Sequence, residues 1–131
     1  MNQKETKFFM EVAEKAKERS YCETPVGGVL VKDSNIISVG WNGTLPGTYN
    51  FCDNNATNVV HACQNLVARA ARAGVKTEGA TLYITKEPCL PCALLLVQAG
   101  VKRVIHSGES NFALGKMIEA GVEVIKYYDR I

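Results

Sequence analysis

The sequence predicts an α/β fold, a three-layer α-β-α sandwich around a mixed five-stranded sheet. Two adjacent strand patterns without a helix between them predict an antiparallel hairpin in the first half of the chain. Strand and helix patterns alternate in the second half, which predicts parallel pairing through right-handed crossovers. Because the 131 residues contain no linker or internal repeat, we expect one domain that spans residues 1–131.

The first half of the chain predicts a helix, the hairpin and a long loop. Apolar residues recur at helical spacing over residues 4–19. Strands are expected over residues 25–32 and 35–41, joined at Asp33-Ser34. Residues 42–58 are rich in Gly, Pro, Asn and Thr and predict a loop. A loop of this length in so small a domain indicates a functional segment.

The second half predicts three helices that alternate with three strands. The expected helices cover residues 59–73, 88–100 and 111–120, and the strands cover 80–85, 101–106 and 122–128. Pro88 is expected at the first position of its helix, because the N–H group that proline lacks would have no partner there.

Composition and charge exclude several classes of protein. The net charge is only +2, with acidic and basic residues interspersed, which makes nucleic acid an unlikely partner. No apolar run is long enough to span a membrane, and the charged N-terminal stretch does not resemble a secretory signal. The five cysteines are an odd number, which argues against a disulfide scaffold. We therefore expect a cytoplasmic protein in a reducing compartment.

The segment "EPCLPC" contains a C-x-x-C pair, Cys89 and Cys92, which is expected on one face of a helix's first turn. The N–H groups and the dipole at that end stabilise thiolates and favour metal binding. His61, at the start of another predicted helix, is a third candidate ligand. Two cysteines and one histidine leave one position of tetrahedral zinc open for a water. A thioredoxin-like redox pair and two packed core cysteines are the alternatives.

Two motifs together resemble the zinc signature of the cytidine deaminase superfamily: His61-Ala62-x-x-Asn65, and Pro88-Cys89-x-x-Cys92. Flanking stretches are similar to deoxycytidylate deaminases, in which a G-Y-N-G stretch is typical; here it is Gly40-Trp41-Asn42-Gly43. The resemblance covers nearly the whole chain. It implies a cytidine deaminase-like fold, a homo-oligomer, and deamination of dCMP to dUMP and ammonia. It also implies zinc bound by His61, Cys89 and Cys92.

The resemblance further implies nucleotide contacts from the loop that starts at Asn42. The predicted substrate-binding residues are Asn42 and Thr44 in this loop, and Ala62 and Pro88 beside the zinc ligands. An Asx turn that stabilises the loop is the alternative role for Asn42. The "EPC" in place of "SPC" is also similar to tRNA adenosine deaminases and guanine deaminases, so these substrates stay open.

Cys63 occupies the position at which this family's chemistry requires a glutamate. In that chemistry zinc activates a water, and the glutamate carries its proton to the ring and then to the leaving ammonia. We predict that position 63 is the catalytic position and that cysteine strongly impairs turnover.

Three interpretations of Cys63 compete: replacement of glutamate by design, natural loss in a nucleotide-binding or regulatory relative, or a role of its own. That role is either a fourth zinc ligand or a reactive thiol. A small buried residue is the simplest alternative. If the chain is active, Asp53 or Glu87 is expected to replace the missing carboxylate.

Overall fold

The computed structural model describes residues 2–52 and 57–129. In these ranges, four helices and five strands follow one another in the predicted order, α-β-β-α-β-α-β-α-β. No helix in these two ranges combines the length and the apolar character needed to cross a membrane. The helices are α1 (Gln3–Lys17), α2 (Ala62–Arg72), α3 (Leu90–Gln98) and α4 (Phe112–Glu119). The strands are β1 (Gly27–Lys32), β2 (Asn35–Trp41), β3 (Thr81–Ile84), β4 (Arg103–His106) and β5 (Glu123–Lys126).

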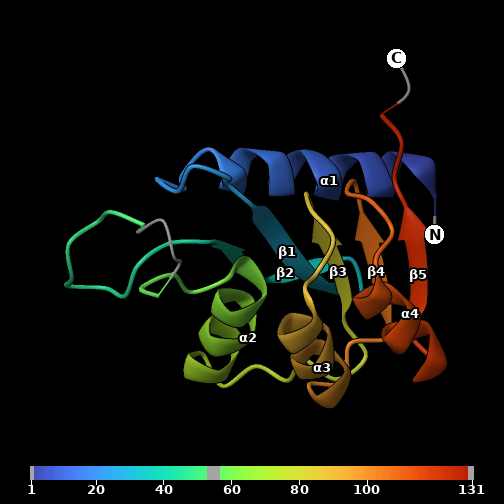
Figure 1. The fold of residues 1–131 in the computed structure, drawn as a ribbon. Helices are drawn as coiled ribbons and strands as arrows, with labels where there is room; N and C mark the ends of the chain where they lie inside the picture. The colour runs from blue at the N-terminus through green and yellow to red at the C-terminus, as the bar shows by residue number, and fades with distance from the viewer. Residues whose placement is uncertain (1, 53–56, 130–131) are drawn as a thin grey trace.

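The five strands form one mixed sheet in the order β2-β1-β3-β4-β5. β1 pairs antiparallel with β2 and β3, whereas β3, β4 and β5 run parallel to one another. Helix α1 lies across one face of the sheet, and α2, α3 and α4 cover the other face (Figure 1). The predicted three-layer α-β-α sandwich with a mixed five-stranded sheet is therefore confirmed.

The hairpin turn lies where the sequence predicts it. Asp33 and Ser34 both have positive φ angles, 52° and 62°. Two successive positive φ values are characteristic of the type I′ turn, whose twist matches that of the two strands it joins. The turn therefore fixes the register of β1 against β2.

Helix α3 begins later than predicted. Cys89 is its N-cap residue, so Pro88 precedes the helix instead of opening it. Pro91 is the proline in the first turn, where it leaves no hydrogen bond unmade. The expectation for Pro88 was thus wrong, because Pro91 satisfies the same preference and Cys89 has the extended backbone of a cap.

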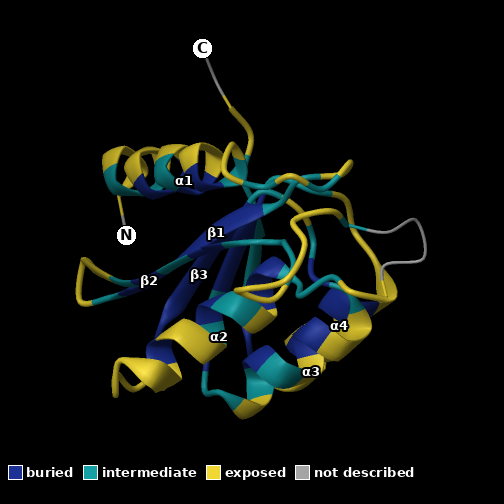
Figure 2. Cartoon of the chain, turned by 90° about the vertical axis from the view of Figure 1, so that its left-hand side faces the viewer, coloured by how far each residue is buried: buried dark blue, intermediate teal, exposed yellow. Residues whose placement is uncertain are grey.

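The core consists of two layers of side chains, one on each face of the sheet. Phe9 and Met10 of α1 pack on Val29, Tyr83 and Ile105 of the strands. The larger cluster joins α2, α3 and α4 to the opposite face, where side chains such as those of Leu66, Leu82 and Leu96 are fully buried. The buried surfaces therefore face one another between the layers, while the outer helix faces are exposed (Figure 2).

Replacing Gly27 with alanine is expected to destabilise the fold. A Cβ at this position would overlap the backbone of Ala13 and Lys17 in α1, so the helix would have to move away from the sheet. We expect Gly27→Ala to lower the free energy of unfolding by about 3 kcal/mol, as measured by urea denaturation. Gly43→Ala is the control, because a Cβ there meets no atom within 4 Å. Equal stability of the two variants would contradict the close approach of α1.

Candidate active site

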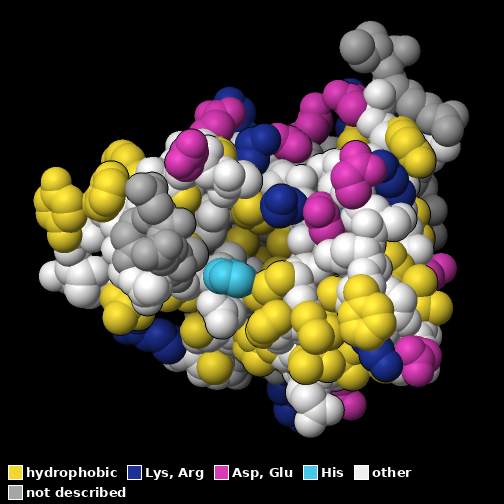
Figure 3. Space-filling view, in the orientation of Figure 1, with side chains coloured by type: hydrophobic (Ala, Val, Ile, Leu, Met, Phe, Trp, Pro, Cys, Tyr) yellow, Lys and Arg dark blue, Asp and Glu magenta, His cyan; other side chains and the backbone are white. Residues whose placement is uncertain are grey.

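The predicted zinc ligands meet where two helices begin. His61 is the N-cap residue of α2, and Cys89 caps α3 with Cys92 in its first turn. Both helix starts lie on the same side of the sheet, beyond the carboxyl end of β3 (Figure 1). In Figure 3 a histidine side chain reaches the surface there, next to a mainly hydrophobic area. The fold thus places the candidate ligands near the carboxyl end of a sheet strand, where α/β proteins commonly bind ligands.

The geometry of the three side chains fits a zinc ion. His61 Nδ1 lies 3.2 Å from Cys92 Sγ and 3.3 Å from Cys89 Sγ. Sulfur and nitrogen ligands of one tetrahedral zinc ion lie roughly 3.5 Å apart. In the two described ranges, His61, Cys89 and Cys92 are the group whose ligand atoms all lie within 4.8 Å of one another. The donor set therefore suits zinc and leaves one coordination position for a further ligand.

Cys63 lies beside this group without joining it. It is the second residue of α2 and only 3% exposed, packed in the core cluster that also contains Leu66 and Ile84. The group of candidate ligands whose atoms all lie within 4.8 Å of one another does not include its sulfur. The arrangement favours an open three-ligand site over one closed by a fourth thiolate.

The protonation of the three thiols is set by their contacts. The pKa of Cys92 is lowered to about 6, and the largest cause is a hydrogen bond that the Cys63 thiol donates to it. The same hydrogen bond, followed by burial, raises the pKa of Cys63 well above its usual value. Burial is also the largest cause of the raised pKa of Cys89. These contacts favour the thiolate form of Cys92 and the protonated form of Cys63 near neutral pH.

A pocket with a volume of about 340 Å³ opens above the cluster. Three of the four predicted substrate-binding residues line it, namely Asn42, Ala62 and Pro88, together with Cys63. Thr44 is not among the lining residues, and its hydroxyl lies 3.5 Å from Asn50 Oδ1 within the loop. The pocket wall is mainly apolar with a few polar groups, as is common for small-molecule sites.

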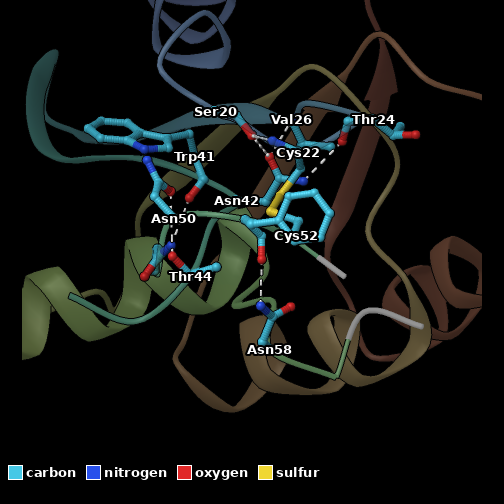
Figure 4. The surroundings of a disulfide bond; sticks show 12 residues. Ser20, Cys22, Thr24, Val26, Trp41, Asn42, Thr44, Asn50, Cys52 and Asn58 are labelled. Carbon is cyan, nitrogen blue, oxygen red and sulfur yellow. Dashed lines mark hydrogen bonds between the residues drawn. A yellow bond between two sulfur atoms is a disulfide. The ribbon is translucent and has the colours of Figure 1, made fainter. Parts of the chain in front are cut away.

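The amide of Asn42 holds the pocket wall together. Its Oδ1 accepts hydrogen bonds from the Val26 N–H at 2.9 Å and the Ser20 hydroxyl at 2.7 Å. Its Nδ2 donates to the Thr24 carbonyl at 3.0 Å (Figure 4). The side chain therefore fastens the loop after β2 to the segment after α1. This structural role differs from the Asx turn considered above, because the partners lie 16 to 22 residues away.

Of the two carboxylates expected to replace the missing glutamate, the structure describes Glu87. Glu87 lines the pocket, but its Oε2 accepts the N–H of Glu109 at 3.1 Å. Burial opposes its ionisation, yet the N–H groups of Glu87 and Glu109 outweigh burial and lower its pKa. Glu87 is thus an ionised carboxylate engaged by the backbone of the next loop. Asp53 lies outside the described residues.

A disulfide bond joins Cys22 to Cys52, which the sequence did not predict (Figure 4). The odd cysteine count was a poor guide, because two cysteines pair while Cys63, Cys89 and Cys92 stay free. The paired cysteines are 30 positions apart, and the segment between them contains the whole hairpin, which folds back and brings them together. The bond fastens the long loop to the segment after α1, alongside the Asn42 hydrogen bonds.

Two polar residues near the site have structural partners. Asn65 Nδ2 donates to the Trp41 carbonyl at 2.7 Å and so fastens α2 to the end of β2. The second histidine, His106, is 2% exposed, and its Nδ1 accepts the Gly108 N–H at 3.2 Å. Asn65 is part of the motif that identified the site, yet its contact is to the backbone of a distant strand. Sequence spacing gave no signal for either bond.

Residues 3–107 match the family described as the cytidine and deoxycytidylate deaminase zinc-binding region. This match covers most of the chain and includes all three candidate ligands. The chain belongs to this family of zinc-binding deaminases.

The chain is also similar to individual proteins. The chain is 33% identical over 122 residues to the deoxycytidylate deaminase of Mycobacterium phage D29, covering 79% of this chain and 94% of the relative. It is 30% identical over 128 residues to ComE operon protein 2 of Bacillus subtilis, covering 89% of this chain and 68% of that one. The dCMP deaminase of cyanophage S-TIM5 in complex with dCMP and dUMP superposes with a TM-score of 0.91 at 32% identity, covering 97% of this chain and 99% of that one.

The three candidate ligands are expected to be needed for zinc, whereas Cys63 is not. Cys92→Ser should lower the zinc content of the purified protein more than about tenfold, because a hydroxyl replaces a thiolate ligand. Cys63→Ser should keep stoichiometric zinc, measured by atomic emission. Cys22→Ser is the matched control at a cysteine outside the cluster. Loss of zinc in Cys63→Ser would instead identify Cys63 as a ligand.

Thiol counting is expected to reveal the disulfide. When the chain is purified without reductant, denatured with a chelator and alkylated, the three free cysteines should react. After prior reduction all five should react. Mass spectrometry of the alkylated chain distinguishes the two numbers. Alkylation of every cysteine without prior reduction would show that Cys22 and Cys52 are not joined.

Proposed function

We propose that residues 1–131 form one deaminase domain that binds zinc and a cytosine nucleotide, of the type that converts dCMP to dUMP and ammonia. The observation that carries this proposal is the His61, Cys89 and Cys92 cluster at the base of a mainly apolar pocket. The structure of the cyanophage relative with dCMP and dUMP supports dCMP as the substrate.

The proposal assigns zinc to His61, Cys89 and Cys92. Bound zinc supplies an activated water in this class of deaminase. The residue at position 63 is expected to move protons between that water, the ring nitrogen and the leaving amine. A carboxylate at this position accepts and returns a proton readily near neutral pH.

Cys63 is poorly suited to that proton transfer. Its sulfur lies closer to the backbone than a glutamate carboxylate would, and its hydrogen bond to Cys92 together with burial raises its pKa and favours the protonated thiol. Glu87, the carboxylate that lines the pocket among the described residues, is engaged by the Glu109 N–H. We therefore propose that turnover is strongly impaired in this chain. A catalytically inactive nucleotide-binding protein on the same fold is the alternative.

We also propose that the protein is cytoplasmic and self-associates. An exposed apolar area on α3 and α4 supports self-association. Its members are Leu90 (40% exposed), Leu94 (54%), Ile118 (58%) and Phe112 (70%). Large apolar side chains exposed on neighbouring helices are common at protein interfaces.

Restoring the carboxylate is expected to restore turnover. Cys63→Glu should convert dCMP to dUMP about 10²–10⁴ times faster than the present chain. This factor is the usual contribution of general acid–base catalysis. Release of ammonia and chromatography of the nucleotides measure the reaction on zinc-loaded protein.

Cys63→Gln is the matched control, because it has nearly the same size without an ionisable group. It should stay as slow as the present chain. Equal rates for the chain and both variants would mean that another group transfers the proton. Binding of dCMP without turnover in every variant would favour the inactive nucleotide-binding protein.

A further inference from the structure

The charged groups around the pocket are few. Outside the candidate ligands His61, Cys89 and Cys92, the described lining residues that carry full charges are Lys86 and Glu87. The recognition of a charged group away from the ligand cluster therefore depends on these two residues. These two residues are neighbours in the sequence, but their side chains have different surroundings.

Glu87 is directed into the adjacent loop. Besides accepting the Glu109 N–H, its carboxylate fills the space over Gly108, where a Cβ would overlap it. A glycine at position 108 thus makes room for the Glu87 side chain. The negative charge is therefore held by a backbone N–H group of the adjacent loop.

Lys86 has no such partner. Its ammonium group makes no hydrogen bond or ion pair within the described residues, and its side chain is exposed while lining the pocket. Two arginines stack on the last residue of β2: the guanidinium groups of Arg19 and Arg69 lie 5.0 and 4.8 Å from the centre of the Trp41 ring. Lys86 is thus the available cation of the pocket wall.

The strand pairing places Lys86 opposite the segment after α1. Gly28 pairs with Ile84, and the Thr85 N–H donates to the Gly27 carbonyl at 3.0 Å. The chain that continues from β3 therefore brings Lys86 to the level of Val26. Thr24, two residues before Val26, also lines the pocket, and its hydroxyl has no hydrogen-bond partner among the described residues. A cation and a free hydroxyl thus belong to the same pocket mouth.

We propose that Lys86, assisted by the Thr24 hydroxyl, binds the phosphate of the nucleotide and makes this site select a nucleoside monophosphate over the free nucleoside. The inference rests on the proposed function and adds its specificity-determining residue. A phosphate dianion forms charge-assisted hydrogen bonds with an ammonium group, which a nucleoside cannot form. The neighbouring Lys86 charge helps to lower the pKa of Glu87, but the two side chains form no ion pair within the described residues, so the ammonium group keeps its hydrogen-bond donors for the phosphate.

Binding to the zinc-loaded chain tests the proposal directly. Calorimetric titration should give weaker dCMP binding to Lys86→Ala by about 10- to 100-fold. Binding of deoxycytidine should change less than about twofold, since it carries no phosphate. Lys86→Arg should restore most of the dCMP affinity, because it retains the charge. Lys76→Ala, a charge removal in the turn after α2 and outside this pocket, is the matched control.

Three results would overturn the proposal. Equal losses for dCMP and deoxycytidine would mean that Lys86 shapes the pocket without binding phosphate. Unchanged dCMP binding in Lys86→Ala would place the phosphate elsewhere. Absence of binding by either compound to the unmodified chain would overturn this proposal and the proposed nucleotide site together.

Turnover in the Cys63→Glu background separates the two proposals. If the single variant deaminates dCMP better than deoxycytidine, and adding Lys86→Glu reverses that preference, both are supported. If it deaminates both compounds and Lys86→Glu leaves their ratio of kcat/KM unchanged, the deaminase function stands and the role of Lys86 is wrong.

Discussion

The meeting of two helix N-termini is the constraint on which the rest of the site depends. His61 and Cys89 are N-cap residues, so their backbones leave the helical path where α2 and α3 begin. Both helices pack on the same face of the sheet, which fixes the distance between their first turns (Figure 1). The imidazole and the two thiols consequently come within 3.2 and 3.3 Å without a long or irregular connection. The core packing of the two helices therefore determines the geometry of the donor set.

Most of the fold could be predicted because its signals are local. The hairpin follows from two residues with positive φ, and the helices follow from apolar spacing and capping residues such as Asn2, whose Oδ1 accepts the Glu5 N–H at 2.7 Å. The zinc cluster could be predicted because its motifs combine residue type with fixed positions at helix starts. Its ligands needed no information on long-range contacts once the two motifs were recognised.

The remaining features depend on contacts between distant segments. The sequence predicts a nucleotide contact for Asn42, but it could not show that the path of the chain after α1 also supplies three protein partners for this amide. The Cys22–Cys52 bond likewise requires that the hairpin fold back before the two thiols approach. The amino-acid sequence does not show which distant segments come into contact. The sequence gives no signal for Lys86, because an exposed lysine is usually a solvated surface residue. Its position in the wall of the pocket is visible only in the structure.

The disulfide changes the topology of the chain in the region of the loop. Residues 22 and 52 close a covalent ring that contains β1 and β2, with Tyr49 and Leu45 among its most exposed apolar side chains. Exposed loop residues of this kind are preferred sites of proteolytic cleavage. A single cut inside the ring would open the backbone, yet both products would stay joined through sulfur and both would keep their place in the sheet. Under oxidising conditions, therefore, a nicked chain retains the covalent continuity of an intact one.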